Sequence, residues 1–87
     1  MTQEEAIAII DDEETLLFYD NCDDALVGVG ARCSCPPVAI YSYEKLVDVF
    51  IAGGMDREES VEWIDFNVLG GWIGPQTPMV IMDTPRS

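Results

Sequence analysis

Short apolar runs separated by turn-forming residues occur along most of the chain. The runs that predict strands lie at residues 15–19, 25–32, 38–41 and 79–82. Residues 20–24 read Asp-Asn-Cys-Asp-Asp, and these residue types favour a turn. We therefore expect the first two strands to form a β-hairpin, and the Pro36-Pro37 pair to end the second strand.

Two helices are predicted between the third and fourth strands. Ser42 can cap a helix over residues 43–52. Asp56 and Glu59 form a capping-box-like pair at the start of a second helix, which runs to about Leu69. Double glycines follow both helices and would end them. The expected buried residues are Leu46, Val47 and Phe50 in the first helix, and Val61, Ile64, Val68 and Leu69 in the second.

The element order β-β-β-α-α-β predicts the α+β class, with a small antiparallel or mixed sheet and two helices packed on one face. Residues 15–83 form this single domain. Residues 1–14 are an acidic N-terminal arm or a short helix: Thr2 and Glu5 match a capping box, but the apolar residues that follow suit a strand equally well. Residues 84–87 form a polar tail. A core of this size leaves only a few kcal/mol of net stability. Formation of a homodimer is therefore one way in which the chain could gain stability.

The chain carries 17 acidic and four basic side chains in 87 residues, for a net charge of −13. Such a density of like charge costs stability through self-repulsion, so we expect it to serve solubility, a cation or a positively charged partner. Direct binding to nucleic acid or to an anionic membrane is not expected, because phosphates would be repelled. No apolar run reaches the ~18 residues that span a bilayer, and the N-terminus lacks the features of a signal peptide.

Composition also argues against an enzyme. The chain has no histidine, and Cys22 lies among aspartates that raise a thiol pKa and make it a poor nucleophile. Cys33 and Cys35 could contribute to a metal site, but structural zinc needs four nitrogen or sulfur ligands. The EF-hand pattern is absent, which leaves weak cation binding by the turn aspartates. Gly28 and Gly30 lack the third glycine and the lysine of nucleotide-binding loops. We expect no catalytic residue, no metal and no cofactor.

Acidic residues are the main candidates for partner binding. They are Asp20, Asp23 and Asp24 in the predicted turn, and Glu58, Glu62 and Asp65 along the flank of the second helix. Carboxylates ~6 Å apart along a helix could imitate the phosphates of a double helix, which carries one charge every ~1.7 Å of its axis. Such a surface would bind a basic groove that normally holds nucleic acid. The alternative is an ordinary solvated acidic surface.

Trp63 and Trp72 are candidates for a second kind of contact, because they flank the second helix and its exit. Packing against the sheet would bury both rings. The alternative is an aromatic anchor in a protein interface, where tryptophan is enriched.

Three stretches of the chain resemble a family of small proteins encoded by bacteriophages and prophages. They are residues 18–29, 38–45 and 65–78, and the string FNVLGGWIG at residues 66–74 is the most specific part. The resemblance implies a phage setting, in the cytoplasm of a bacterial host cell, and supplies no catalytic residues. In size and charge the chain is similar to the anti-CRISPR inhibitors, several of which occupy a DNA-binding surface.

The leading functional prediction is a non-enzymatic inhibitor of a bacterial defence system, which binds a basic nucleic-acid-binding surface by acidic mimicry. One alternative is a protein that binds or sequesters a small ligand in a pocket near Trp72 and the glycines. Another is a structural or accessory phage protein. Salt-sensitive partner binding would favour the first function, and thermal stabilisation by a ligand would favour the second.

Overall fold

The computed structural model describes residues 1–10, 16–32, 35–72 and 74–83. Expectations for residues 11–15, for Cys33 and for the tail at 84–87 lie outside this part. The elements, in chain order, are helix α1 (Gln3–Ile10), 3-10 turn η1 (Asp23–Ala25), strands β1 (Leu26–Arg32) and β2 (Cys35–Ser42), helices α2 (Tyr43–Ala52) and α3 (Arg57–Trp63), π-helix η2 (Ile64–Leu69) and strand β3 (Met79–Ile81).

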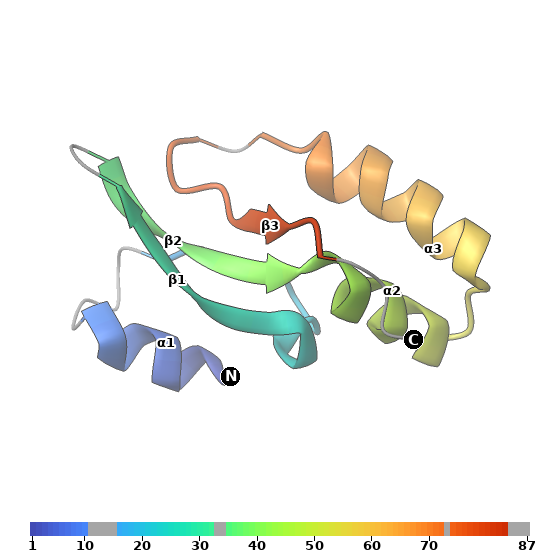
Figure 1. Cartoon of the computed structure of the whole chain (residues 1–87), viewed down its shortest axis with the longest axis horizontal. Helices are drawn as coiled ribbons and strands as arrows, with labels where there is room; N and C mark the ends of the chain where they lie inside the picture. The colour runs from blue at the N-terminus through green and yellow to red at the C-terminus, as the bar shows by residue number, and fades with distance from the viewer. Residues whose placement is uncertain (11–15, 33–34, 73, 84–87) are drawn as a thin grey trace.

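The three strands form one mixed sheet in the order β1-β2-β3 (Figure 1). β1 and β2 are antiparallel, with Val29 opposite Ala39, and β2 and β3 are parallel, with Tyr41 opposite Val80. The α+β class and the mixed sheet are therefore confirmed. The element order differs from the prediction, because residues 16–19 form no strand and the N-terminal arm contains helix α1.

The expected hairpin between residues 15–19 and 25–32 is wrong. Residues 16–19 form no strand, and the hairpin partners are β1 and β2 instead. The backbone N–H of Tyr19 donates a hydrogen bond to the Tyr41 hydroxyl at 3.0 Å, and the two rings pack at a tilt of 43° with centroids 4.9 Å apart. Tyr19 thus packs against the core without being part of a strand. The pattern of apolar residues alone does not distinguish a strand from an irregular segment that packs on the core.

Pro36 and Pro37 lie inside β2, so the expectation that they end a strand is wrong as well. β3 pairs with β2 only from Ile40 to Ser42, which leaves the proline end of β2 with β1 as its one neighbour. A register irregularity between Gly30 and Arg32 lies opposite the prolines. Proline is tolerated at such positions because fewer ladder hydrogen bonds are required there.

The predicted helix starts are confirmed. Ser42 accepts a hydrogen bond from the backbone N–H of Lys45, and Asp56 and Glu59 form a complete capping box. At the N-terminus, Thr2 and Glu5 form reciprocal side-chain to backbone bonds of 3.0 and 3.1 Å, so the arm begins as helix α1 and not as a strand. These bonds satisfy N–H groups that lack partners in the first turn of a helix.

The carboxylate of Asp83 joins the end of the sheet to the start of α2. One of its oxygens accepts from the Ser42 hydroxyl, and the other accepts from the backbone N–H of Glu44 at 3.0 Å. Ser42 is the last residue of β2 and the N-cap of α2. The strand therefore passes into the helix without a connecting loop.

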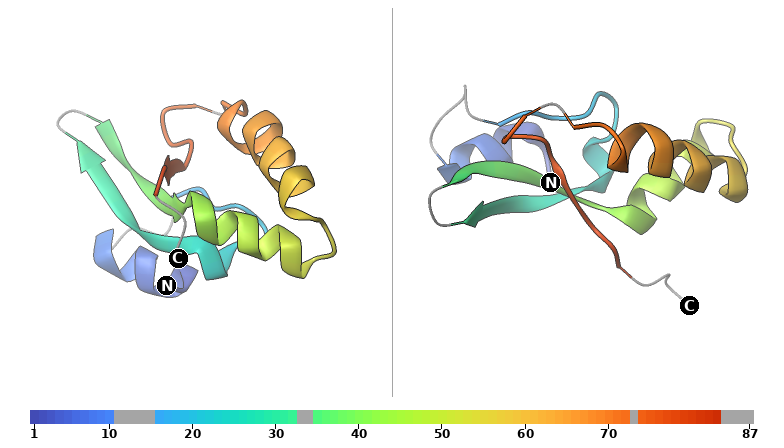
Figure 2. Two further views of the ribbon diagram at one scale, coloured as in Figure 1. Left: turned by 45° about the vertical axis from the view of Figure 1, so that its right-hand side comes forward. Right: turned by 90° about the horizontal axis from the view of Figure 1, so that it is seen from above.

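This junction places α2 and α3 differently from the prediction. Figures 1 and 2 show the two helices side by side and mostly beyond the end of the sheet, and not stacked on its face. A bidentate ion pair links Arg57 of α3 to Glu44 of α2, with N–O distances of 3.0 and 3.1 Å. Within the described residues, no helix is long and apolar enough to cross a membrane.

One hydrophobic core connects the sheet to the helices. Its buried side chains are Ala6, Leu16, Cys22, Ala25, Leu26, Ala39, Tyr41, Leu46, Val47, Ile64 and Val68. Leu46, Val47, Ile64 and Val68 had been predicted to be buried. Leu69 had been predicted there too, but it is 46% exposed. A π-helix has more residues per turn than an α-helix, so the turn at η2 displaces side chains from the α-helical stripe.

The two glycines after η2 end the helix for a steric reason. A Cβ atom added to Gly70 would lie 2.7 Å from the carbonyl oxygen of Phe66, and one added to Gly71 would lie 2.7 Å from that of Asn67. Real Cβ atoms do not approach backbone atoms this closely, so the chain can leave the helix along this path only with glycine at both positions.

We predict that Asp56→Ala lowers the free energy of unfolding by about 1 kcal/mol, because it removes the oxygen that accepts the N–H of Glu59 at 2.8 Å. Chemical denaturation measures the change. Asp48→Ala is the control, because Asp48 is an exposed acid inside α2 rather than at its start. Equal stability of the parent and the Asp56 variant would show that the cap does not stabilise the fold.

Burial raises the pKa of Tyr41 to about 12, from an ordinary value of 10.0. The folded state therefore holds this phenol proton more tightly than the unfolded state does. The resulting contribution is fully present below pH 10, and it is lost as the pH rises from 10 to about 12.

We predict that unfolding free energy falls over this pH range by on the order of 2 kcal/mol. Tyr41→Phe should be less stable by about 1–3 kcal/mol at neutral pH, because the buried N–H of Tyr19 loses its acceptor. The variant should also show a flatter decline above pH 10. Denaturation at a series of pH values tests both points, and an identical decline in the two proteins would exclude Tyr41 as the cause.

Candidate partner-binding site

Acidic side chains dominate the surface. Twelve of the thirteen acidic residues in the described part of the chain are exposed, and Glu44 is half-buried. Arg57 and Glu44 form an ion pair, but the chain has 17 acidic and only four basic side chains. Most of the negative charge is therefore not neutralised within the molecule, and it is available to attract a positively charged partner.

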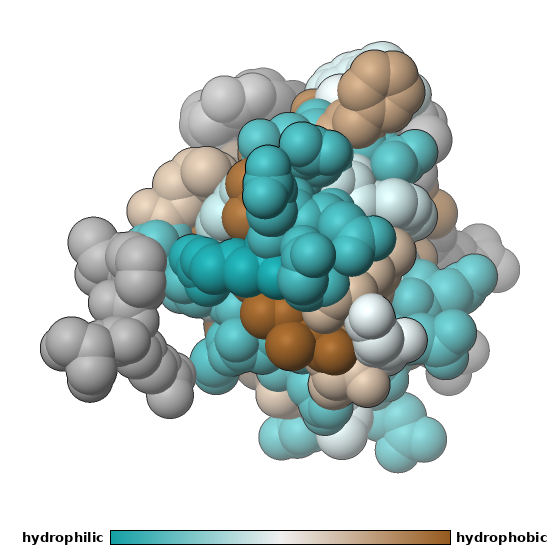
Figure 3. Space-filling model, turned by 90° about the vertical axis from the view of Figure 1, so that its right-hand side faces the viewer, coloured by the Kyte–Doolittle hydropathy of each residue, from teal (hydrophilic) through white to brown (hydrophobic). Residues whose placement is uncertain are grey.

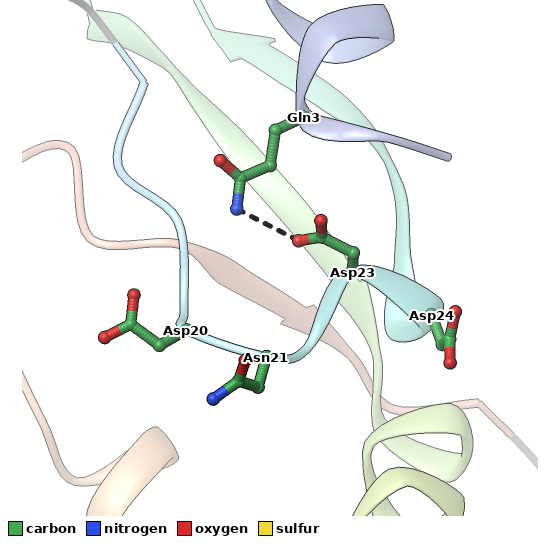
Figure 4. Close-up of a pocket in the computed structure, with 5 residues that line it drawn as sticks. All are labelled: Gln3, Asp20, Asn21, Asp23 and Asp24. Carbon is green, nitrogen blue, oxygen red and sulfur yellow. Dashed lines mark hydrogen bonds between the residues drawn. The ribbon is translucent and has the colours of Figure 1, made fainter.

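The aspartates of the 20–24 loop do not converge on one point. Asp23 accepts a hydrogen bond from the side-chain amide of Gln3 at 3.0 Å. Figure 4 shows the carboxylates of Asp20 and Asp24 on opposite sides of the loop, pointing away from each other. Among the described residues, no group of three or more possible ligands is arranged to hold a metal ion. The loop is a spread of separate negative charges.

A groove of about 380 Å³ lies along α3 and η2, where carboxylates and aromatic rings meet. Its lining residues are Met55, Glu59, Glu62, Trp63, Phe66 and Asn67. Four of these follow the spacing i, i+3, i+4 and i+7, which places them on one side of a helix. The groove therefore brings together two residues that the sequence had indicated, Glu62 and Trp63.

Trp63 is fixed on one side and open on the other. Its ring packs against Phe50 of α2 with centroids 4.7 Å apart, and it stays 40% exposed. Phe66 is 82% exposed, so it contributes little to the core. Asn67 donates a hydrogen bond from its side-chain amide to the backbone oxygen of Trp63 at 3.1 Å. The result is a pair of accessible rings on a rigid helix, with two carboxylates beside them.

The other predicted residues of this helix lie outside the groove. Glu58 is exposed but is not part of the lining. Asp65 accepts a hydrogen bond from the Tyr43 hydroxyl of α2 at 3.2 Å. The three acids expected on one flank thus have different surroundings, and Glu62 is the one that lines the groove with Trp63 and Phe66.

Trp72 belongs to a separate groove. It is 76% exposed, which is inconsistent with burial against the sheet, and it lines a hollow together with residues of β1, β2 and β3. Trp63 does not contribute to this second groove. The two tryptophans therefore mark two independent surfaces.

Cys22 is buried, and its thiol pKa is raised by burial first and by the charges of Asp23 and Asp20 second. A raised pKa keeps the sulfur protonated and unreactive at neutral pH. This agrees with the sequence-based expectation that Cys22 is a poor nucleophile.

The predicted binding residues did not include Glu59 or Phe66, although Phe66 flanks the second helix together with the two tryptophans. Glu59 had been assigned to the helix cap, and its side chain does accept from the Asp56 N–H at 3.5 Å while it lines the groove. Phe66 lies four residues after Glu62, so helical spacing was the signal that could have joined them.

Comparisons of the chain with protein-family models, with curated proteins and with solved structures found no match. The resemblance to phage-encoded proteins stays a prediction, and function has to be inferred from the residues themselves.

The two tryptophans should differ in their access to solvent. We predict that acrylamide quenches the fluorescence of a Trp63→Phe variant, which keeps the 76% exposed Trp72, more strongly than that of a Trp72→Phe variant, which keeps the 40% exposed Trp63. Stern–Volmer plots of both single-tryptophan proteins measure the difference. Equal slopes would contradict the two exposures, and denatured samples serve as the control because both rings are then fully exposed.

Proposed function

We propose that this chain is a non-enzymatic inhibitor that binds a basic nucleic-acid-binding surface of a bacterial defence protein. The observation that carries the proposal is the groove on α3 and η2, where Glu59 and Glu62 lie beside the exposed rings of Trp63 and Phe66. The surrounding acidic surface supplies attraction at longer range.

The groove has the chemistry that recognises an arginine or lysine side chain. A guanidinium or ammonium group is attracted to an aromatic face within about 6 Å of the ring centre, and arginine also stacks on such rings. Carboxylates at the rim add charge-assisted hydrogen bonds. Because Trp63 is supported by Phe50 at 4.7 Å, its free face is oriented before a partner arrives.

Acidic residues around the groove would extend this contact over a basic surface of the partner. Figure 3 shows the end of the molecule formed by α2 and α3, where hydrophilic residues cover the middle of the face beside a smaller hydrophobic patch. On α3 and at its N-cap, the carboxylates of Asp56, Glu58, Glu59 and Glu62 are exposed. Proteins that hold nucleic acid present basic grooves, and an acidic surface of this kind competes for them by steering and by charge complementarity.

A catalytic role is not part of the proposal. The sequence contains no histidine, and the raised pKa of Cys22 leaves that thiol without a nucleophilic role. The resemblance of residues 18–29, 38–45 and 65–78 to phage-encoded proteins supports a defence protein as the target, because small acidic phage proteins include inhibitors of such systems.

Competition with nucleic acid tests the proposal. Purified CRISPR surveillance complexes and other DNA-binding defence proteins are each mixed with the chain before their target duplex is added, and duplex binding is measured by mobility shift. At least one of them should lose DNA binding, and the effect should weaken as salt rises because exposed charges are screened over ~8–10 Å. Unchanged DNA binding across the panel at low salt would overturn the proposal.

A matched pair of charge reversals separates the groove from general charge. Glu62→Lys and Glu58→Lys change the net charge equally on the same exposed helix, but only Glu62 lines the groove. We predict that Glu62→Lys weakens binding to a fluorescein-labelled arginine-glycine peptide at least about tenfold, and that Glu58→Lys changes it less than about threefold. Fluorescence polarisation measures both affinities. Equal losses would mean that the acidic surface acts only through its total charge.

A further inference from the structure

The sheet has a second face that the core does not use. Paired residues point to the same side of a sheet, so Gly28, Gly30, Val38, Ile40 and Met79 share one face through their pairing across β1, β2 and β3. The opposite face carries Leu26, Ala39 and Tyr41, which are all buried. Met79 is 54% exposed, and the side chains of its face are not part of the buried core.

Residues that follow η2 turn this apolar face into a groove. Trp72, Pro75 and Thr77 form one wall, and the strands form the floor of a hollow of about 540 Å³. Thr77 holds the wall in shape, because its hydroxyl and its backbone N–H both donate to the backbone oxygen of Gly74, at 2.6 and 3.0 Å. The volume falls within the roughly 300–1,000 Å³ that is typical of sites for small molecules.

One glycine on the floor of the groove is covered by a neighbouring side chain. A Cβ atom added to Gly30 would lie 2.7 Å from the Cδ1 atom of Ile40, so the Ile40 side chain lies over this glycine. Gly30 therefore lets Ile40 lie close to β1, and Ile40 supplies an apolar surface on the floor of the groove.

The chemistry of the lining selects an uncharged occupant. None of the side chains described in the groove is ionisable, although the chain as a whole carries a charge of −13. An anion would meet the repulsive field of the molecule, and a cation would find no carboxylate in the lining to pair with. An apolar molecule gains by leaving water, and an aromatic one gains further by stacking on the exposed face of Trp72.

We propose that the groove between Trp72 and the sheet binds a small, uncharged, apolar molecule, with an aromatic group stacked on Trp72. This site is separate from the acidic groove on α3, and it does not depend on the inhibitor function. An uncharged ligand is recognised there by shape and by stacking. Its binding therefore does not depend on salt, in contrast to the binding of a basic partner at α3.

The uncharged fluorescent dye N-phenyl-1-naphthylamine tests the proposal. Its emission should rise saturably on addition of the folded protein, with one site for each chain and no change in affinity as salt rises. Trp72→Ala should weaken dye binding about tenfold, because it removes the stacking surface. Trp63→Ala is the matched control and should leave dye binding unchanged while it impairs binding of the arginine-glycine peptide, so the two proposals fail separately.

A second variant, Val38→Trp, keeps the proposal testable if Trp72→Ala does not fold. Val38→Trp keeps a β-forming residue but fills the groove, so it should also abolish dye binding, and circular dichroism checks that each variant is folded. Dye binding that survives both Trp72→Ala and Val38→Trp would overturn the proposal, as would a folded protein that binds no dye. Sedimentation that shows a dimer dissociated by Trp72→Ala would also overturn it, because a second copy would then occupy the groove.

Discussion

The contact between Ser42 and Asp83 determines how the parts of this small protein are arranged. It joins the point where β2 passes into α2 to Asp83, just after β3, which lies 41 positions further along the sequence. Because the strand becomes a helix at Ser42, α2 continues beyond the sheet, and α3 packs beside it. The chain must then return from η2 to the sheet to pair β3 parallel to β2, and this return forms the wall of the Trp72 groove.

Like-charge repulsion is the second constraint, and the two grooves respond to it in opposite ways. The hollow on α3 places Glu59 and Glu62 beside aromatic rings, and a cation is the occupant that we propose for it. The hollow on the sheet contains no described ionisable side chain, which keeps it free of the repulsion that exists elsewhere on the surface. The chain thus has two chemically distinct grooves, and each of them is lined by one tryptophan.

The sequence predicted those parts of the fold that depend on residues close together in the chain. The caps at Ser42 and Asp56 involve residues three positions apart, so their spacing is visible in the chain. The packing of Tyr19 on Tyr41 joins residues 22 positions apart and replaced the predicted strand at 16–19, and no local pattern encodes it. The two grooves also differ in how far local sequence patterns could predict them. Glu62 and Trp63 were predicted as binding residues on one helix, whereas the sheet floor opposite Trp72 depends on a strand order that periodicity does not reveal.

The exit from η2 has a consequence for how sequences of this fold can diverge. Backbone oxygens lie where any side chain at Gly70 or Gly71 would have to begin, so selection has no alternative residue to accept at either position. Exposed carboxylates outside the helix caps and the Asp83 contact, such as those of Glu58 and Glu62, have no such restriction, and aspartate and glutamate can exchange there with little effect on the fold. The acidic surface can therefore change in sequence without loss of the fold, while a substitution in the glycine pair before Trp72 would require the backbone to shift.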